Sequence, residues 1–539
     1  MKKTKTFLAA GSILTAALAL TACGGNYSSS SSNKKELNWE ESAEIPTMDL
    51  SKATDSASFT QLINTMEGLY RAKSDGSQEK AMATSEKVSK DGKTYTFTLR
   101  KDNKWSNGDP VTAQDFVYSW RRTVDPKTAS QYAYLFEGIK NATDIQNGKK
   151  KPETLGIKAV GKYKLVVTLD RRIPYFNNLM AFGSFFPQNK KAVKKYGSKY
   201  GTASKYMVYN GPYIMSGWSG SSLSWKLKKN PYYWDKKNVK LDAVNYSVQK
   251  TPSTAYNLYQ SNKLDAVALD AEQSKQLKSV KGYALYPRGT TFYIQFNQAK
   301  NKYLQNANIR KALSMAINRE SLTKVLGGSN TVAHTFTPAK LTTVNGKDYT
   351  SLISKSDEAY TYYNKKEAQK YLKQGMKELG VSKLSFKLLS DDTDGAKKST
   401  EAMQSNIQET LPQVSITTQN LPFKTRLART NALNFDMVVS AWGADFNDPI
   451  SFLDLLTSTN AQNGGKWSNK EYDKLIAASK TTGSDSERWS NLSKAEGILL
   501  KDVGISPLYS STSAWIVRPE IKGLVNLRDH WDFKYAHVN

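Results

Sequence analysis

Cys23 is the only cysteine among the 539 residues of this chain, and this constrains how the chain can be stabilised. A single thiol cannot close an intramolecular disulfide, so the folded state must draw its stability from buried apolar cores. The length is ample for such cores and predicts about two to four domains. Hydrophobic residues make up 39% of the chain and aromatic residues 11%, which is typical of a globular protein.

The segment before Cys23 has the layout of a secretory signal. Three lysines within the first five residues form a basic start, an apolar run rich in Ala and Leu covers residues 7–20, and Thr21-Ala22 supplies small residues at a cleavage point. The apolar run is shorter than the roughly 20 residues that a permanent transmembrane helix needs, and no second run of that length follows. We therefore expect residues 1–22 to be a cleaved signal peptide.

The tetrad Leu20-Thr21-Ala22-Cys23 resembles the lipobox of bacterial lipoproteins. The resemblance implies cleavage just before Cys23 and a covalent diacylglycerol group on its thiol; an ordinary signal peptide followed by a chance cysteine is the alternative. Residues 23–35 are rich in Gly, Ser, Asn and Lys, so they are expected to form a flexible tether with a reach of roughly 20 Å. We therefore expect a protein anchored by lipid on the extracytoplasmic face of the cell membrane, at a Gram-positive cell surface.

The chain carries a formal net charge of +29, which falls to +26 once the leader and its three lysines are removed. A strongly basic chain can indicate a nucleic-acid partner. The lysines, however, are spread along the whole chain, as in Lys190-Lys191, Lys228-Lys229 and Lys236-Lys237, and no single helix or arm collects them. We expect no nucleic-acid binding, and we expect an exported basic protein to lie against anionic lipid and wall polymers.

Strand and helix patterns interleave along the folded body, which favours an α/β or α+β fold. Residues 95–100 and 163–169 alternate with period two and predict strands. After a turn cluster at 106–110, Thr112 is a candidate N-cap with Asp115 three residues later, so a helix is predicted there with Phe116 and Trp120 on one face. A second amphipathic helix is predicted within 306–326 from Ile309, Leu313, Ala316 and Ile317.

No catalytic constellation is evident in the sequence. The three histidines, His334, His530 and His537, have no cysteine or carboxylate at metal-ligand spacing, although the last two are seven residues apart and could align on a helix. Phosphate-binding, nucleophile-elbow and metalloprotease motifs do not occur. We expect no metal and no cofactor, and no enzymatic activity, although hydrolysis by two carboxylates alone is left open because it needs no fixed spacing.

Four blocks along the body resemble the oligopeptide-binding (OppA-like) proteins of peptide ABC importers, which form extracellular solute-binding protein family 5. The blocks occur in the family's order. They are residues 92–100 with 104–122; Asn210-Gly211-Pro212-Tyr213 with 229–234; Phe296-Asn297 with 309–319; and 441–449 with Ser468-Asn469 and Tyr472-Asp473.

The resemblance implies a periplasmic-binding-protein-like α/β fold of class C (type II), in which two lobes close on a cleft. It divides the body into a discontinuous domain I over 36–68, 200–299 and 512–539, a domain II over 69–199 and a domain III over 300–511. It also implies a monomer that captures extended oligopeptides and delivers them to the membrane permease and ATPase subunits of an ABC importer. A peptide-pheromone sensor, a surface adhesin or a receptor for another solute on the same fold is the alternative.

In this family the aspartate of the W-x-A-D block binds the α-amino group of the peptide, and Asp445 stands at that position. From the residues alone, Asp445 could equally cap a turn in Asp-Phe-Asn-Asp-Pro. Trp442 would wall the cleft beside it, with ordinary core packing as its alternative.

Three further positions match the family less specifically. Asn297 falls where an asparagine meets the ligand backbone, Phe423 where the family has an aromatic residue, and Tyr132 where domain II has a tyrosine near the ligand. One position departs from the pattern: some relatives carry an arginine for the peptide carboxylate where this chain has Val439. Recognition of the peptide C-terminus is therefore left open.

Overall fold

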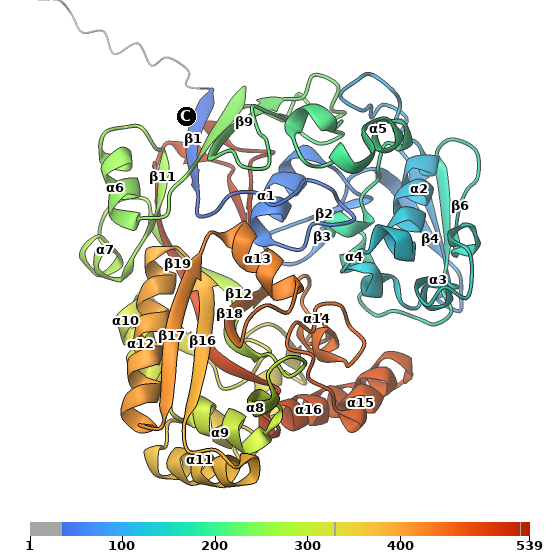
Figure 1. Cartoon of the computed structure of the whole chain (residues 1–539). Coiled ribbons are helices and arrows are strands. Elements are labelled where there is room, and N and C mark those ends of the chain that lie inside the picture. The colour runs from blue at the N-terminus through green and yellow to red at the C-terminus, as the bar shows by residue number, and fades with distance from the viewer. Residues whose placement is uncertain (1–34, 328–329, 529) are drawn as a thin grey trace, which may run out of the picture. The chain divides into compact units, whose positions relative to one another are not determined.

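The structure is a computed structural model that describes residues 35–327, 330–528 and 530–539, and from Lys35 onward the chain forms one compact unit. Cys23 and the residues of the predicted leader and tether lie outside the described residues, apart from Lys35. The described part contains two four-stranded sheets and one seven-stranded sheet, with four short two-stranded ribbons (Figure 1).

The first sheet joins the start of the described chain to a segment two hundred residues later. Its strand order is β1-β10-β9-β8, in which β1 pairs with β10 in parallel and the other pairs are antiparallel. The strands are β1 (Glu36–Glu41), β8 (Tyr213–Ser216), β9 (Ser224–Lys229) and β10 (Ala243–Val248). This pairing unites two of the three segments that were predicted to form a discontinuous domain.

The second four-stranded sheet lies within the segment that was predicted as domain II. Its order is β4-β5-β7-β6, and helix α2 packs against it. The bounds are β4 (Ala83–Val88), β5 (Thr94–Leu99), α2 (Ala113–Val124), β6 (Ile157–Ala159) and β7 (Lys164–Thr168), so both predicted strands and the predicted helix are confirmed. The Asp115 carboxylate accepts hydrogen bonds from the Thr112 backbone N–H (2.8 Å) and Oγ1 (3.0 Å), and Phe116 and Trp120 are fully buried.

The seven-stranded sheet has the order β11-β19-β12-β18-β16-β17, with β13 (Thr331–Val332) paired to β19. Strands β12 and β19 are its long central pair and run antiparallel along most of their length. A bulge interrupts their register, because Arg288 and Gly289 lie between two residues of β12 that pair with Ser511 and Thr512. The strands are β11 (Ala266–Leu269), β12 (Tyr283–Phe296), β16 (Leu384–Asp391), β17 (Val414–Leu421), β18 (Met437–Gly443) and β19 (Ile505–Val517).

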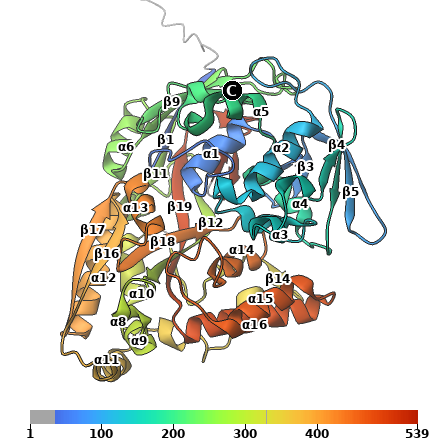
Figure 2. The same cartoon turned by 45° about the vertical axis from the view of Figure 1, so that its right-hand side comes forward.

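Helices cover the faces and ends of this large sheet (Figures 1 and 2). Helix α12 packs on β16 and β17, α9 packs on α11, and α15 packs on α16. The longer helices of the unit are α1 (Ser56–Thr65), α6 (Pro252–Gln260), α9 (Ala307–Met315), α10 (Arg319–Leu326), α11 (Lys365–Leu379), α12 (Asp394–Thr410), α13 (Phe423–Asn431), α15 (Lys470–Thr481) and α16 (Asp485–Lys501). Shorter ones include α3 (Ala142–Gln146), α4 (Phe176–Leu179), α5 (Lys190–Tyr196), α7 (Ala271–Gln276), α8 (Lys302–Gln305) and α14 (Ile450–Leu453).

The amphipathic helix predicted within 306–326 is confirmed as α9, but the expectation that it continues through Ala316 and Ile317 is wrong, because α9 ends at Met315 and a second helix, α10, begins at Arg319. Asn318 caps the second helix by accepting a hydrogen bond from the Ser321 backbone N–H (2.9 Å). Arg319, which is fully buried, donates to the carbonyl groups of Ser314 (3.1 Å) and Pro507 (2.6 Å). A capping residue and a buried cation at the break therefore outweigh the continuous apolar pattern.

The suggestion that His530 and His537 align on one helix is also wrong. His530 begins strand β22 (His530–Asp532) and His537 begins strand β23 (His537–Val538). These strands pair with β21 (Val525–Leu527) and β20 (Ile521–Lys522), respectively. The C-terminal residues thus return to the body as short ribbons.

Domain boundaries stay a prediction, but the sheets bear on them. The predicted division at 511/512 coincides with the bulge between β12 and β19, while β19 itself passes through it without a break. On β12 the irregularity lies at 287–290, about ten residues before the predicted division at 299/300. Strand β19 thus crosses the predicted boundary between domains III and I, whereas β12 lies wholly within the predicted domain I.

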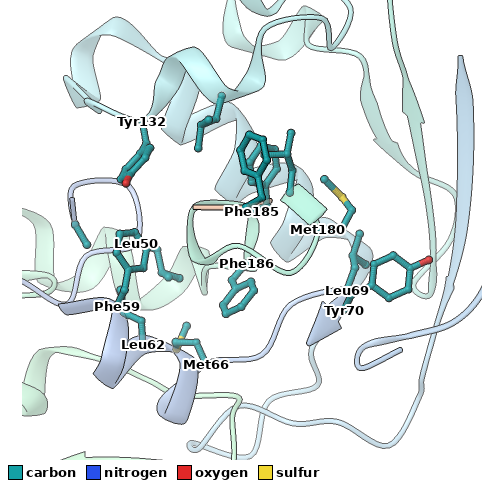
Figure 3. Packing of buried hydrophobic residues seen from close by; sticks show 14 of the residues in the cluster. Leu50, Phe59, Leu62, Met66, Leu69, Tyr70, Tyr132, Met180, Phe185 and Phe186 are labelled. Atoms are coloured by element: carbon teal, nitrogen blue, oxygen red, sulfur yellow. The ribbon is translucent and has the colours of Figure 1, made fainter. Parts of the chain in front are cut away.

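An apolar core joins the first helix to the segment that was predicted as domain II. Phe59 and Leu62 of α1 belong to one buried cluster with Leu69, Met180, Phe185 and Phe186, and Figure 3 shows Phe186 between α1 and Leu69. The rings of Phe59 and Phe182 have centroids 4.9 Å apart. Burying side chains of this size contributes about 1.5–3 kcal/mol each, so this core supplies the stability that a disulfide-free body needs.

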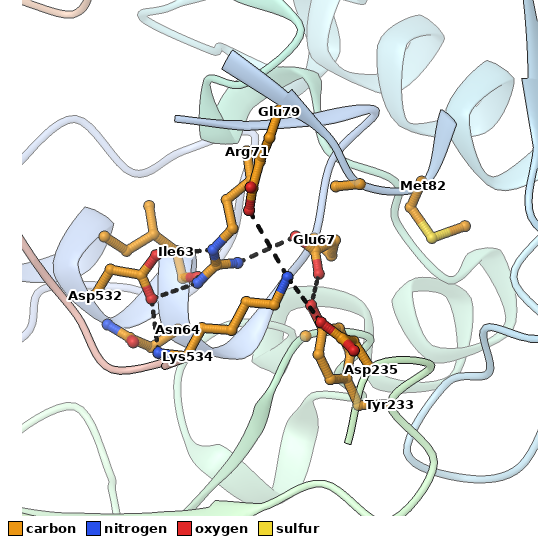
Figure 4. A network of polar contacts seen from close by, with 12 residues as sticks. Ile63, Asn64, Glu67, Arg71, Glu79, Met82, Tyr233, Asp235, Asp532 and Lys534 are labelled. Atoms are coloured by element: carbon orange, nitrogen blue, oxygen red, sulfur yellow. Dashed lines mark hydrogen bonds and ion pairs between the residues drawn. The ribbon is translucent and has the colours of Figure 1, made fainter. Parts of the chain in front are cut away.

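A buried polar network ties the same region to the C-terminal residues (Figure 4). The Arg71 guanidinium donates to both carboxylate oxygens of Asp532 (2.8 and 2.6 Å) and to Glu67 (3.1 Å). Lys534 lies 3.3 Å from Asp235, and Tyr233 donates a hydrogen bond to Glu67. Because these groups are almost fully buried, each charge depends on its partners.

We expect the substitution Arg71→Met to lower the free energy of unfolding by about 3–5 kcal/mol, because it leaves Asp532 and Glu67 as buried charges without their cation. Urea denaturation followed by tryptophan fluorescence measures this change. The matched control is Lys226→Met, which breaks the exposed Lys226–Glu36 pair (2.9 Å) and is expected to cost less than about 1 kcal/mol. Equal effects of the two substitutions would contradict the role assigned to the network.

No helix among the described residues combines the length and the apolar character that crossing a bilayer requires.

Candidate functional site

A cavity of about 750 Å³ lies within the compact unit. Its walls come from segments that are far apart in the sequence, and they include β1 of the first sheet and several strands of the large sheet. The lining residues lie mainly within 39–78, 131–183, 249–295, 390–466, 509–515 and 526–528. A cavity with contributions from all of these segments can enclose a ligand that reaches several parts of the fold at once.

The cavity lies at the carboxyl ends of three parallel strands. Strand β16 pairs in parallel with both β17 and β18. Just beyond the ends of these strands, Asp392, Phe423 and Asp445 line the cavity. In open α/β sheets, ligands bind outside the carboxyl ends of the strands, so the topology marks this cavity as the binding site.

Strand β18 offers an open edge to the cavity. On one side it pairs with β12 from Met437 to Gly443, but on the other side β16 pairs with it only at Met437 and Val438. Residues 439–443 therefore have no strand on that side among the described residues, and all of them line the cavity. Their N–H and C=O groups can pair with an extended chain laid along the edge.

Asp445 lies two residues beyond the end of this strand. Oη of Tyr132 donates a hydrogen bond to Oδ1 of Asp445 (2.9 Å), and the Asp445 backbone N–H donates to Oγ of Ser451 (2.9 Å). The second carboxylate oxygen, Oδ2, is buried and has no hydrogen-bond partner in the described part of the chain. Desolvation raises the pKa of Asp445 to about 8, although the hydrogen bond from Tyr132 acts in the opposite direction. A buried carboxyl with a spare oxygen is suited to pairing with a cation.

An aromatic wall adjoins the carboxyl group. The Tyr132 ring lies 6.0 Å from Trp442 and 5.2 Å from Phe182, measured between centroids, and Phe59 packs edge-on to it at 5.8 Å. All four residues line the cavity. Tyr132 is almost fully buried, whereas Trp442 is half-buried, so the wall is rigid on one side and presents ring surface to the cavity on the other.

The structure thus brings four of the five predicted residues to one cavity: Asp445, Trp442, Tyr132 and Phe423. Phe423 is the first residue of α13 and lies under the guanidinium of Arg426 (5.1 Å to the ring centroid). Arg426 in turn pairs with Asp391 (2.8 Å). Their roles toward a ligand stay predictions.

Asn297 does not line the cavity, so the expectation that it meets the ligand is not supported by its position. The side chain is fully buried, and its amide group donates to the carbonyls of Leu433 (3.0 Å) and Phe435 (2.7 Å). Its oxygen accepts from the Lys300 backbone N–H (3.0 Å). These bonds give Asn297 a structural role in holding the loop before β18 against the end of β12.

Val439 lies on the open strand edge, where some relatives carry an arginine. Its side chain is buried in the apolar core between the large sheet and its helices. An aliphatic side chain at this position offers no charge to an anionic ligand group.

Several other charges of the cavity are committed to one another. Lys250 pairs with Asp392 (2.7 Å), and the Asp55 carboxylate caps α1 by accepting from the Ser58 backbone N–H and Oγ (both 2.8 Å). Desolvation raises the pKa of Asp55 to about 6 and that of Glu41 to about 7. Among the described residues, no group of three histidine, cysteine or acidic side chains forms a metal site.

An ion cluster that was not predicted from the sequence lies beside the cavity. Nζ of Lys480, on α15, lies 2.6 Å from Glu137 and 2.7 Å from Asp454, and Arg171 lies 3.3 Å from Glu137. Lys480 and Asp454 belong to the C-terminal half, whereas Glu137 and Arg171 belong to the segment before residue 199. Single charged residues without a motif carry no signal of such a contact in the sequence.

Comparisons with known proteins agree with the fold. Residues 78–464 match the family described as bacterial extracellular solute-binding proteins, family 5 Middle. The dipeptide-binding protein of Lactococcus lactis subsp. cremoris is 37% identical over 97% of each chain. OppA of Listeria monocytogenes bound to peptide superposes with a TM-score of 0.90 at 42% identity, over 94% of this chain and 99% of that one.

Two further solved structures are informative. The pheromone receptor PrgZ superposes with a TM-score of 0.88 at 35% identity, over 94% of this chain and all of that one. The murein tripeptide-binding protein MppA of Escherichia coli gives 0.85 in one structure and only 0.60 in its unliganded open form, each at 31% identity over 94% of this chain and 98% and 97% of theirs. The arrangement of the present chain is therefore closer to the former structure than to the open form.

The raised pKa of Asp445 predicts how stability depends on pH. Between the pKa of the unfolded state, about 4, and the folded value of about 8, the folded protein holds more protons than the unfolded chain. The free energy of unfolding should therefore fall as pH rises through this range, and Asp445→Asn should flatten that fall and exceed the wild type in stability at pH 8. Urea denaturation of the ligand-free protein at pH 5 and pH 8 measures both, with the exposed Asp242→Asn as control. An unchanged pH dependence in Asp445→Asn would contradict the assignment.

Proposed function

This chain belongs to family 5 of the bacterial extracellular solute-binding proteins, and from that premise we propose that it captures extended oligopeptides and delivers them to an ABC importer. The observation that carries the proposal is Asp445, a buried carboxyl with a spare oxygen at the end of an open strand edge that lines the main cavity. A free peptide offers the matching features in the same order, since its ammonium group leads directly into an extended backbone.

Recognition of the shared parts of a peptide explains how one receptor accepts many sequences. The peptide backbone pairs with the free edge of β18 over 439–443 as an added strand, while its ammonium group pairs with Asp445 and lies against Trp442 and Tyr132. Side chains then occupy the rest of the 750 Å³ cavity, where water adapts to different shapes. The peptide carboxylate finds no charge at Val439, so another cation of the cavity holds it or, in longer peptides, it remains solvated.

We further propose a location and an assembly for the protein. Residues 1–22 are removed, Cys23 carries a diacylglycerol group, and residues 23–35 tether a monomeric receptor to the outer face of the cell membrane, beside its permease and ATPase subunits. The body is divided into domain I (36–68, 200–299 and 512–539), domain II (69–199) and domain III (300–511). The protein has no enzymatic activity of its own and needs no cofactor.

The similarity to the pheromone receptor PrgZ favours one second candidate, a receptor for signalling peptides on the same fold. Uptake of labelled nutrient peptides by a strain that lacks this protein distinguishes peptide import from peptide sensing. Loss of uptake supports import, whereas uptake at the wild-type level indicates sensing.

The amine site is tested by calorimetry with one peptide and its N-acetylated form. Acetylation removes the charge that Asp445 would pair with, so we expect it to weaken binding by at least about 100-fold, since losing one partner of a buried, hydrogen-bonded charge pair costs about 2–5 kcal/mol. Asp445→Ala should lose affinity for the free peptide and bind both forms about equally. Equal affinity of the wild type for the two forms of the peptide would show that Asp445 does not pair with the peptide ammonium group.

Closure around the peptide has a candidate latch in the ion cluster of Lys480, Glu137, Asp454 and Arg171. Lys480 is nearly buried and joins the proposed domain III to Glu137 of the proposed domain II. The Tyr175 and Phe446 rings stack beside this cluster at 4.8 Å, again between the two proposed domains. Figure 2 shows α14 and α15 beneath the part that contains α3 and α4.

We expect Glu137→Gln to weaken binding of all peptides by a similar factor, about tenfold, because it removes a contact that is made only when the two parts meet. Titration of three unrelated peptides against the variant measures this uniformity. Glu153→Gln, an exposed residue in the same segment, is the control. A loss confined to one peptide would show that Glu137 contacts side chains and does not act through closure.

A further inference from the structure

In the folded protein, the positive charge of the chain is not evenly distributed. Between Asp170 and Asp235 the sequence contains no carboxylate side chain but eleven lysines and arginines. Six of these lysines lie close together on α5 and the two helical turns that follow it, so the expectation that no single helix collects them is wrong. We call this set the α5 patch; it consists of Lys190, Lys191, Lys194, Lys195, Lys199 and Lys205.

The α5 patch is solvent-exposed and poor in counter-charges. All six lysines are exposed, while Ala192 and Val193 on the other side of α5 are buried. Only Lys191 has an ion pair recorded within the described part of the chain, at 3.3 Å from Asp109. Along α5 the pairs Lys190–Lys194 and Lys191–Lys195 place like charges four residues apart, which destabilises a helix by about 0.2–0.5 kcal/mol per pair. An anionic partner would relieve this repulsion.

Two tyrosines give the α5 patch an amphipathic character. The Tyr196 and Tyr206 rings lie 5.4 Å apart and tie α5 to the turn that contains Lys205. Lys195 lies 5.4 Å from the centre of the Tyr196 ring, and Lys199 and Lys205 lie 5.8 and 5.2 Å from that of Tyr206. Lysines beside half-buried tyrosines are typical of surfaces that meet a membrane interface, where the rings lie at the level of the headgroups.

The α5 patch lies at the same end of the body as the first described residues. Figures 1 and 2 both show α5 at the top, level with β1 and β9. The sheet order carries the connection, since β1 pairs with β10, β10 with β9 and β9 with β8, and β8 contacts the turn of Lys205. Lys228, which is exposed on β9, extends the positive charge toward β1.

We propose that the α5 patch is a docking surface for anionic phospholipid headgroups, which holds the receptor body against the membrane with this end facing the bilayer. The inference rests on the proposed lipid anchor, because a tether from Cys23 to Lys35 reaches roughly 20 Å and keeps the patch near the surface. Within about a Debye length, 10 Å at 0.1 M salt, each lysine is attracted to an anionic leaflet. The lipid anchor keeps the receptor body near the membrane, and the α5 patch determines which end of the body faces the bilayer.

The test uses the chain that remains after leader removal, carrying Cys23→Ser so that no lipid contributes. We expect it to co-sediment with vesicles that contain phosphatidylglycerol, not with pure phosphatidylcholine vesicles, and to dissociate as salt rises. Changing Lys190, Lys191, Lys194 and Lys195 to Gln should lower the partition coefficient by at least about 30-fold, since each lysine near an anionic surface contributes about a factor of five. The matched control changes four exposed lysines elsewhere, Lys149, Lys151, Lys158 and Lys162, to Gln and should alter it less than twofold.

Equal losses in the two variants would overturn the proposal, because they would reflect net charge alone. Binding of soluble polyphosphate without binding of vesicles would overturn it in favour of an anionic wall polymer. Peptide calorimetry on the α5 variant should give the wild-type affinity. This readout separates the membrane-docking proposal from the peptide-binding proposal. Failure of the wild type to bind peptide would count only against the peptide-binding proposal.

Discussion

The antiparallel ladder between β12 and β19 is the constraint on which the other parts depend. These two strands carry β11 at one end and β18 at the other, so they fix where the cavity edge of β18 lies relative to the first sheet. The bulge at Arg288 and Gly289 lies within this ladder, and the Gly289 carbonyl accepts a hydrogen bond from Ala444, next to Asp445 (3.1 Å). A change in the angle between the two ends of the ladder would therefore move Asp445 directly.

The contact between Tyr132 and Asp445 couples that frame to the segment before residue 199. The hydrogen bond holds one carboxylate oxygen and leaves the other without a partner, in surroundings that disfavour a negative charge. A cation entering here would restore the charged form and would be positioned by the same tyrosine. The chemistry of the site thus depends on two segments that are more than 300 residues apart in sequence and meet only in the folded protein.

Local patterns predicted local structure well, and they failed where a distant contact decides the outcome. The strands near Tyr95 and Leu165 and the capped helix after Thr112 follow from alternation and capping alone. The break between α9 and α10 depends on carbonyl groups that include Pro507, about 190 residues away, which bind the Arg319 guanidinium. Family resemblance indicated Asp445, Trp442, Tyr132 and Phe423, but it could not show that the amide of Asn297 is saturated by backbone carbonyls, or that Glu137 meets Lys480.

In the closure proposed here, two opposing contributions would set the balance between open and closed forms. As the proposed latch, the cluster of Lys480 and Glu137 would favour closure whether or not a peptide is present, whereas closure around Asp445 without a cation would desolvate a carboxyl that has one unpaired oxygen. A ligand shifts such an equilibrium only by its differential affinity for the two forms, and the proposed ammonium–carboxylate pair would exist only in the closed one. Strengthening the latch would raise the closed population of the ligand-free protein, but it would also slow release of the peptide. A receptor that must hand over its ligand therefore benefits from an amine site that opposes closure when the site is empty.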